Sequence, residues 1–185
     1  MPFAQSVGMY FVKTFFMLSK RYILMPAGNM IFMNLNELVA HIKKNTRLLG
    51  IDLGSKTIGI AVSDPFLKIA SPITTLIRLK LSKNSIELDK IVNEYQVGGL
   101  IVGLPINMDG TEGPRAQATR DWTLDLVKAL QLPAAFWDER LSTIAVERMM
   151  LKADMTRKRR AAKIDQAAAA YILQGALDNI TMQTS

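Results

Sequence analysis

The sequence predicts an α/β fold in which a five-stranded mixed sheet is flanked by helices. Three segments of strand-like composition, at residues 48–53, 57–62 and 70–78, follow one another with short connections, which favours an antiparallel meander. Apolar and helix-periodic segments then alternate, which favours parallel strands joined by helical crossovers. With 185 residues, of which 49% are hydrophobic and 21% charged, the chain suits one domain with a single core.

The meander begins with a hairpin. Residues 48–53 are apolar apart from one carboxylate, and residues 57–62 are rich in β-branched side chains, which favour strands. Gly54, in the turn between them, tolerates the positive φ that tight hairpin turns need. Residues 70–78 have the composition of a third strand, which completes the meander.

The remaining elements alternate between helix and strand. In order, they are a helix that begins at the capping box of residues 84–87 and ends at Gly98 and Gly99, a strand at 100–102, a helix whose first residue is Pro114, a strand at 134–137, a helix through Met150, and a last helix at about 163–178. This order of elements is that of the ribonuclease H-like fold.

Residues 1–46 differ in composition from the rest, and we expect them to be an N-terminal extension of a domain at residues 47–185. The extension is expected to be partly disordered or to reflect a mis-assigned start, with Met30 or Met33 as the beginning. An amphipathic surface helix is the alternative for residues 1–32. The extension lacks the roughly 18–20 uninterrupted apolar residues of a membrane span, and its charges lie inside the apolar part, unlike those of a signal peptide.

The charge of the chain favours an anionic partner. Lysine and arginine number 23 against 16 acidic residues, a net charge of +7, and nucleic acid is the commonest partner of such a surface. The densest positive run contains Arg157, Lys158, Arg159, Arg160 and Lys163. Such a run is also typical of a solvated loop, but we expect it to contact nucleic acid. The absence of cysteine excludes thiolate metal sites and fits a cytoplasmic protein.

Two segments have features of a ligand site. Asp52 interrupts an apolar strand, and on its own face of that strand the flanking residues are Gly50 and Gly54, which leave space for a hydrated cation and a phosphate. The alternative is that Asp52 only bonds a local turn. The loop at residues 103–114 leaves the carboxyl end of a strand, where ligands bind in α/β sheets, and it exceeds the usual two to six residues. An ordinary connection is the alternative for this loop.

Three carboxylates are expected to converge. In the ribonuclease H-like arrangement, the middle of the first strand, the end of a later strand and the start of the last helix meet, and these places hold Asp52, Glu139 and Asp165. Oxygen ligands without histidine or cysteine suit Mg²⁺ or Mn²⁺. Two such ions roughly 4 Å apart would support phosphodiester cleavage.

The same segments resemble the bacterial YqgF (RuvX) family over about residues 47–178. The motifs that carry the resemblance are residues 50–59, residues 103–105 with Asp109 and Gly110, residues 138–143, and residues 165–168. The resemblance implies a nuclease that matures the 5′ end of pre-16S ribosomal RNA, with Asp52, Glu139 and Asp165 as its acidic residues. It also implies that the loop at residues 103–110, with Pro105 and Asn107, and the basic run near Arg157 face the substrate. We expect Lys56 and Arg140, within the matching motifs, to contact it too.

Other functions are open from the sequence alone. The same chemistry would serve a nuclease acting on branched DNA such as a Holliday junction, and the acidic cluster could be vestigial in a non-catalytic assembly factor. An actin-like ATPase or sugar kinase shares the strand motif but needs roughly twice this length. We expect no membrane partner and either a monomer or a homodimer.

Overall fold

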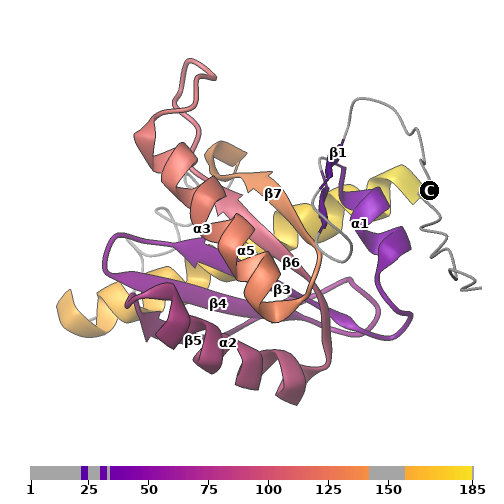
Figure 1. The fold of residues 1–185 in the computed structure, drawn as a ribbon, viewed down its shortest axis with the longest axis horizontal. Coiled ribbons are helices and arrows are strands. Elements are labelled where there is room, and N and C mark those ends of the chain that lie inside the picture. The colour runs from indigo at the N-terminus through magenta and orange to yellow at the C-terminus, as the bar shows by residue number, and fades with distance from the viewer. Residues whose placement is uncertain (1–21, 25–29, 33, 142–156, 185) are drawn as a thin grey trace, which may run out of the picture.

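The computed structural model describes residues 22–24, 30–32, 34–141 and 157–184, and its described part contains one seven-stranded sheet (Figure 1). The strand order is β1-β2-β7-β6-β3-β4-β5. The strands are β1 (Tyr22–Leu24), β2 (Met30–Phe32), β3 (Arg47–Leu53), β4 (Thr57–Ser63), β5 (Ala70–Ile77), β6 (Val97–Leu104) and β7 (Ala134–Asp138). β3, β4 and β5 pair antiparallel, whereas β6 and β7 run parallel to β3, which confirms the expected meander with added parallel strands.

Helices cover both faces of this sheet (Figure 1). The helices are α1 (Leu35–His41), α2 (Leu81–Tyr95), α3 (Pro114–Leu130) and α5 (Arg157–Thr184), with the short 3₁₀ helix η1 (Glu139–Leu141) after β7. α2 and α3 contribute to the core on one face, and α1 and α5 contribute to the core on the other. None of the described helices has the length and apolar character of a membrane span.

The sheet has two more strands than the five expected, because β1 and β2 extend it beyond β7. Each is three residues long, too short to show the alternation by which a strand is recognised in a sequence. Phe32 of β2 and Leu38 of α1 are fully buried, so this described part of the first 46 residues packs on the sheet. The domain boundary expected at residue 47 stays a prediction.

Three helix boundaries differ from those expected. α2 begins at Leu81, because Asn84 is buried inside the helix rather than at its start; its side chain accepts a hydrogen bond from the Leu79 amide and donates one to the Ile77 carbonyl. α2 then ends at Tyr95, where Gln96 adopts a φ of 54°. Gly98 and Gly99 belong to β6 instead. α5 begins at Arg157, before the expected residue 163, and the helix expected through Met150 lies outside the described residues.

Close packing of α5 on the sheet depends on glycine. A Cβ placed on Gly50 of β3 would lie 2.7 Å from the Cβ of Leu173 and 2.9 Å from the carbonyl oxygen of Ala169. Carbon atoms in contact normally lie about 3.5–4 Å apart, so this position admits no side chain. Gly50 therefore lets α5 approach the strand that carries Asp52.

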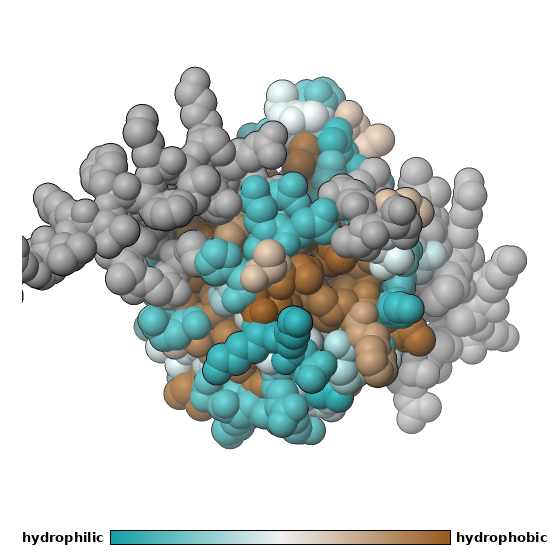
Figure 2. All heavy atoms as spheres, turned by 90° about the vertical axis from the view of Figure 1, so that its right-hand side faces the viewer, coloured by the Kyte–Doolittle hydropathy of each residue, from teal (hydrophilic) through white to brown (hydrophobic). Residues whose placement is uncertain are grey.

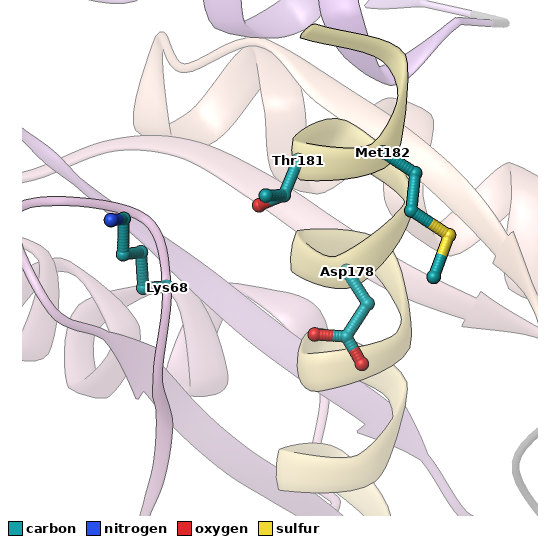
Figure 3. Close-up of a pocket in the computed structure, with 4 residues that line it drawn as sticks. All are labelled: Lys68, Asp178, Thr181 and Met182. Atoms are coloured by element: carbon teal, nitrogen blue, oxygen red, sulfur yellow. The ribbon is translucent and has the colours of Figure 1, made fainter. Parts of the chain in front are cut away.

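The C-terminal half of α5 is hydrogen-bonded to the β4–β5 connection. The side chain of Gln174 accepts a hydrogen bond from the Ala70 amide and donates one to the Lys68 carbonyl. Lys68 of this connection and Asp178, Thr181 and Met182 of α5 line a cleft at this contact (Figure 3). Figure 2 shows the end of the molecule that carries α1, where polar side chains surround an exposed apolar area.

Candidate active site

The carboxyl ends of three parallel strands meet at one edge of the sheet. β3, β6 and β7 are neighbours and run in the same direction, so the residues at and after their ends lie close together. Asp52 is the penultimate residue of β3, and Glu139 follows the last residue of β7 directly as the first of η1. The structure therefore brings two of the three predicted catalytic residues to the same edge, which we call the carboxyl edge.

Both strands beside Asp52 present glycine to it. Gly59 is its partner in β4, and in β6 Gly103 follows Val102, the partner of Ile51. Asp52 is half-buried despite its charge. Two neighbours without side chains leave room beside this carboxylate for another group.

Glu139 occupies that room. A Cβ placed on Gly103 would lie 2.6 Å from Oε1 of Glu139 and 2.6 Å from Cδ1 of Ile172 in α5. The carboxylate of Glu139 therefore lies over Gly103, on the face that α5 covers, and Gly103 separates it from Asp52 along the sheet. Any side chain at residue 103 would compete with Glu139 for this space.

The electrostatics of Glu139 follow from this placement. Burial is the main cause that raises its pKa from 4.5 to about 7, and the negative charge of Asp52 adds to the effect. The guanidinium of Arg115 lowers the pKa of Glu139, and Asp138 raises it slightly. Two carboxylates that repel each other in a half-buried site are destabilising unless a cation or a proton offsets their charge.

Arg115 was not predicted from the sequence as a site residue. It is the second residue of α3, directly after Pro114, and its charge acts on Glu139 across the carboxyl edge. Its side chain is exposed, so it can also reach a ligand. The sequence did offer one signal for this role: Arg115 is a cationic residue next to Pro114, which begins the helix after the long loop.

Arg140 and Asn107, both expected to contact substrate, lie together. The Arg140 guanidinium donates hydrogen bonds to both carboxylate oxygens of Asp138, at 3.1 Å from Nε to Oδ1 and 2.6 Å from Nη2 to Oδ2, and to the Asn107 carbonyl at 3.3 Å. Its hydrogen bonds hold the pKa of Asp138 below the usual value. Arg140 thus links the end of β7 to the β6–α3 loop.

That loop is a compact hairpin that projects beyond the sheet (Figure 1). The Asn107 amide donates to the Thr111 carbonyl at 2.9 Å, and Asp109 Oδ1 accepts from both the amide and the hydroxyl of Thr111. Gly110 has a φ of 87°, which favours glycine. Pro105 and Asn107 therefore lie on an ordered loop at the carboxyl edge.

Comparison with known proteins places the chain in a family. A family model described as "RuvX: Holliday junction resolvase" matches residues 46–179. The chain belongs to the RuvX family. A relative from Rhodospirillum centenum, named "Putative pre-16S rRNA nuclease", is 55% identical over 80% of this chain and 81% of its own length. One of the same name from Rhodobacter capsulatus is 52% identical over 82% of this chain and 95% of its own length.

A solved structure supports the fold assignment of this RuvX-family chain. The structure of Thermus thermophilus RuvC in complex with a Holliday junction substrate has a TM-score of 0.50 and 14% identity, and the match covers 76% of this chain and 98% of the other. At that identity the likeness concerns the fold alone. The expected ribonuclease H-like fold is confirmed.

The other predicted site residues are placed only in part. Lys56 lies exposed in the β3–β4 turn, beside the carboxyl edge. Asp165 lies in α5 one turn before Ala169, which contacts the strand of Asp52, but its side chain is outside the described part. The same holds for the side chains of the basic run, Arg157, Lys158, Arg159, Arg160 and Lys163. Among the described side chains, no three histidine, cysteine or acidic residues form a metal site, so Asp165 as a third ligand stays a prediction.

Proposed function

We propose that this chain is a metal-dependent nuclease that hydrolyses phosphodiester bonds in structured RNA and matures the 5′ end of pre-16S rRNA. The observation that carries the proposal is the placement of Glu139 beside Asp52 at the carboxyl edge, where burial and then the Asp52 charge raise the pKa of Glu139. The name shared by relatives about half identical to this chain supports the RNA substrate.

A divalent cation fits this pair of residues. Asp52 and Glu139 offer carboxylate oxygens, the ligands that Mg²⁺ and Mn²⁺ prefer, and both lie half-buried where their charges need compensation. We assign Asp52, Glu139 and Asp165 as the residues that hold it. When bound, the cation supplies Lewis-acid stabilisation of the charge that develops in phosphodiester cleavage.

The side chains around the pair have separate tasks. Arg115 partly offsets the charge at Glu139 and stands where it can also pair with a substrate phosphate. Arg140, by bonding both Asp138 and Asn107, holds the β6–α3 hairpin against the end of β7. This hairpin and Lys56 of the β3–β4 turn then contact the nucleic acid on either side of the carboxylates.

A four-way DNA junction is the second candidate substrate. The description of the matching family model favours it. Cleavage of RNA and of DNA needs the same carboxylates, so the substrates must be compared directly.

The test is a cleavage assay on precursor 16S rRNA and on a four-way DNA junction in parallel. With Mg²⁺ the wild-type protein should cleave the RNA at its 5′ end, and EDTA or the substitution Asp52→Asn should abolish the cleavage. Asp89→Asn, the same change at an exposed position of α2, is the control and should cleave like wild type. Preferential cleavage of the junction would select the second candidate, and binding without cleavage would indicate a non-catalytic assembly factor.

A further inference from the structure

A cluster of four cations lies at the carboxyl edge on the side of Asp52 away from Glu139. Lys56 follows β3, Arg78 follows β5, and Lys80 and Lys83 lie at the start of α2. Figure 1 shows the end of β5 and the beginning of α2 at the same end of the sheet as the end of β3. We call Lys56, Arg78, Lys80 and Lys83 the basic ledge.

Hydrogen bonds fix the backbone of the basic ledge. The Arg78 amide donates to the Lys56 carbonyl at 2.9 Å, and Nη1 of Arg78 donates to the Gly54 carbonyl at 2.8 Å. The fully buried side chain of Asn84 bonds the backbone on both sides of Arg78, at Ile77 and Leu79. The three exposed lysines therefore extend from a backbone that is already fixed, so that binding has to order only their side chains.

The charge of the basic ledge is not balanced within the described structure. Lys56, Lys80 and Lys83 are exposed, and no described acidic side chain forms an ion pair with them. Residues 54–86 contain one acidic residue, Asp64, which follows the opposite end of β4, and Glu87, one turn after Lys83 in α2, forms no described ion pair with it. Lysines at the start of a helix also repel its dipole, so an anion bound there would relieve an unfavourable arrangement.

We propose that the basic ledge binds phosphates of the substrate strand that flank the scissile bond. This inference rests on the proposed function and adds a second contact surface, on the side of the carboxylates opposite the β6–α3 hairpin. β5 is two strands away from β3. Arg78 reaches back to the β3–β4 turn, whereas Lys80 and Lys83 begin α2 beyond the end of β5, about 10 Å from the strand of Asp52 at about 4.8 Å per strand, so these two lysines contact phosphates beside the scissile one. The substrate strand therefore continues along the carboxyl edge beyond the point of cleavage.

The test is a binding measurement in the Asp52→Asn background, which prevents cleavage during titration. The probe is a fluorescein-labelled RNA hairpin with a single-stranded 5′ extension, titrated at several salt concentrations. The double variant Lys80→Ala/Lys83→Ala should raise Kd by about tenfold and reduce the slope of log Kd against log salt by about two, one for each lost phosphate contact.

A matched control removes the same charge at the other end of the sheet. Lys43 and Lys44 are exposed and precede β3 at its amino end, so Lys43→Ala/Lys44→Ala should leave the salt slope unchanged. Equal losses in the two double variants would show a general effect of net charge and would overturn the proposal. Lys80→Arg/Lys83→Arg should keep tight binding, and thermal melts check that all variants fold.

Neutral linkages in the RNA locate the contact. A methylphosphonate removes the charge of one phosphate, and such linkages on one side of the scissile bond should weaken binding to the Asp52→Asn protein. The same linkages should have no further effect on the ledge variant. Wild-type protein that binds but does not cleave would reject the nuclease assignment and leave the ledge in place, whereas unchanged binding by the ledge variant would reject the ledge even if wild type cleaves.

Discussion

Around β3, aliphatic side chains fill one face of the sheet, whereas a closely packed helix and two carboxylates occupy the other. Its residues Leu49, Ile51 and Leu53 point to the face covered by α2 and α3 and lie in a core of aliphatic side chains. On the other face, Gly50 contacts α5, and Asp52 and Glu139 lie on either side of Gly103. The face that carries the proposed chemistry is thus the one where helix and carboxylates need space. We expect added atoms on this face to cost activity at Gly103 and stability at Gly50.

The largest expected effect concerns the charge on the α5 face. The folded protein raises the pKa of Glu139 from 4.5 to about 7, so between these pH values the folded state binds a proton more tightly than the unfolded state. The free energy of unfolding of the metal-free protein should therefore fall as the pH rises from 4.5 to 7 and stay reduced above it. A shift of this size corresponds to about 3 kcal/mol.

Urea denaturation with EDTA at pH 4.5 and pH 8 measures this loss. Glu139→Gln should remove the pH dependence, whereas Glu94→Gln, at an exposed position of α2, should retain it. Saturating Mg²⁺ should also flatten the profile, because a bound cation favours the ionised carboxylates. An equally steep profile in Glu139→Gln would assign the effect to another group.

The second prediction separates chemistry from stability on the α5 face. In Gly103→Ala the new methyl meets the flexible ends of Glu139 and Ile172, which can move aside at little cost in stability. Moving Glu139 by about 1 Å should nevertheless lower kcat by about a hundredfold. Cleavage assays and thermal melts on the same variant check both halves. A large loss of stability with normal kcat in the folded fraction would contradict it.

The sequence predicted those parts of the site that depend on local patterns. Alternation placed Asp52 on a glycine-lined face of the first hairpin, and the strand that ends at Asp138 put Glu139 at the carboxyl edge. The beginning of α3 at Pro114 is confirmed, because proline suits the first turn of a helix. Local sequence patterns are sufficient where a single strand or helix determines the position of a residue.

The rest depends on contacts between distant segments. The contact of Glu139 with Gly103 requires the register of β6 against β7, which no local pattern specifies. Asn84 is of a residue type that commonly caps helices. In the fold it is buried within α2, and its side chain forms hydrogen bonds with the backbone of the turn before the helix. Arg115 has an effect on Glu139 only because the loop and the strand end meet in space. The expected roles of Asp165 and of the basic run stay predictions.

The third prediction adds one carbon to the α5 face at a rigid position. In Gly50→Ala the methyl meets the backbone of Ala169 and the Cβ of Leu173, neither of which can move without shifting α5. We expect a loss of about 2 kcal/mol in the free energy of unfolding, the usual cost of overpacking. Urea denaturation measures it. A Gly50→Ala variant whose free energy of unfolding equals or exceeds that of wild type would show that α5 can shift. The two faces of the sheet would then not differ in how tightly they are packed.

The smallest expected effect comes from removing one carbon at the next residue, on the opposite face. Ile51 is fully buried among the aliphatic side chains of the α2 and α3 core. Ile51→Val should cost about 1 kcal/mol through lost burial and a small cavity. Because the methylene lies on the far side of β3 from the carboxylates, kcat and the Mg²⁺ dependence of cleavage should match wild type. A loss of kcat as large as that in Gly103→Ala would show that the position of Asp52 depends on packing behind its strand. The aliphatic face would then belong to the active site as much as the face that carries the carboxylates.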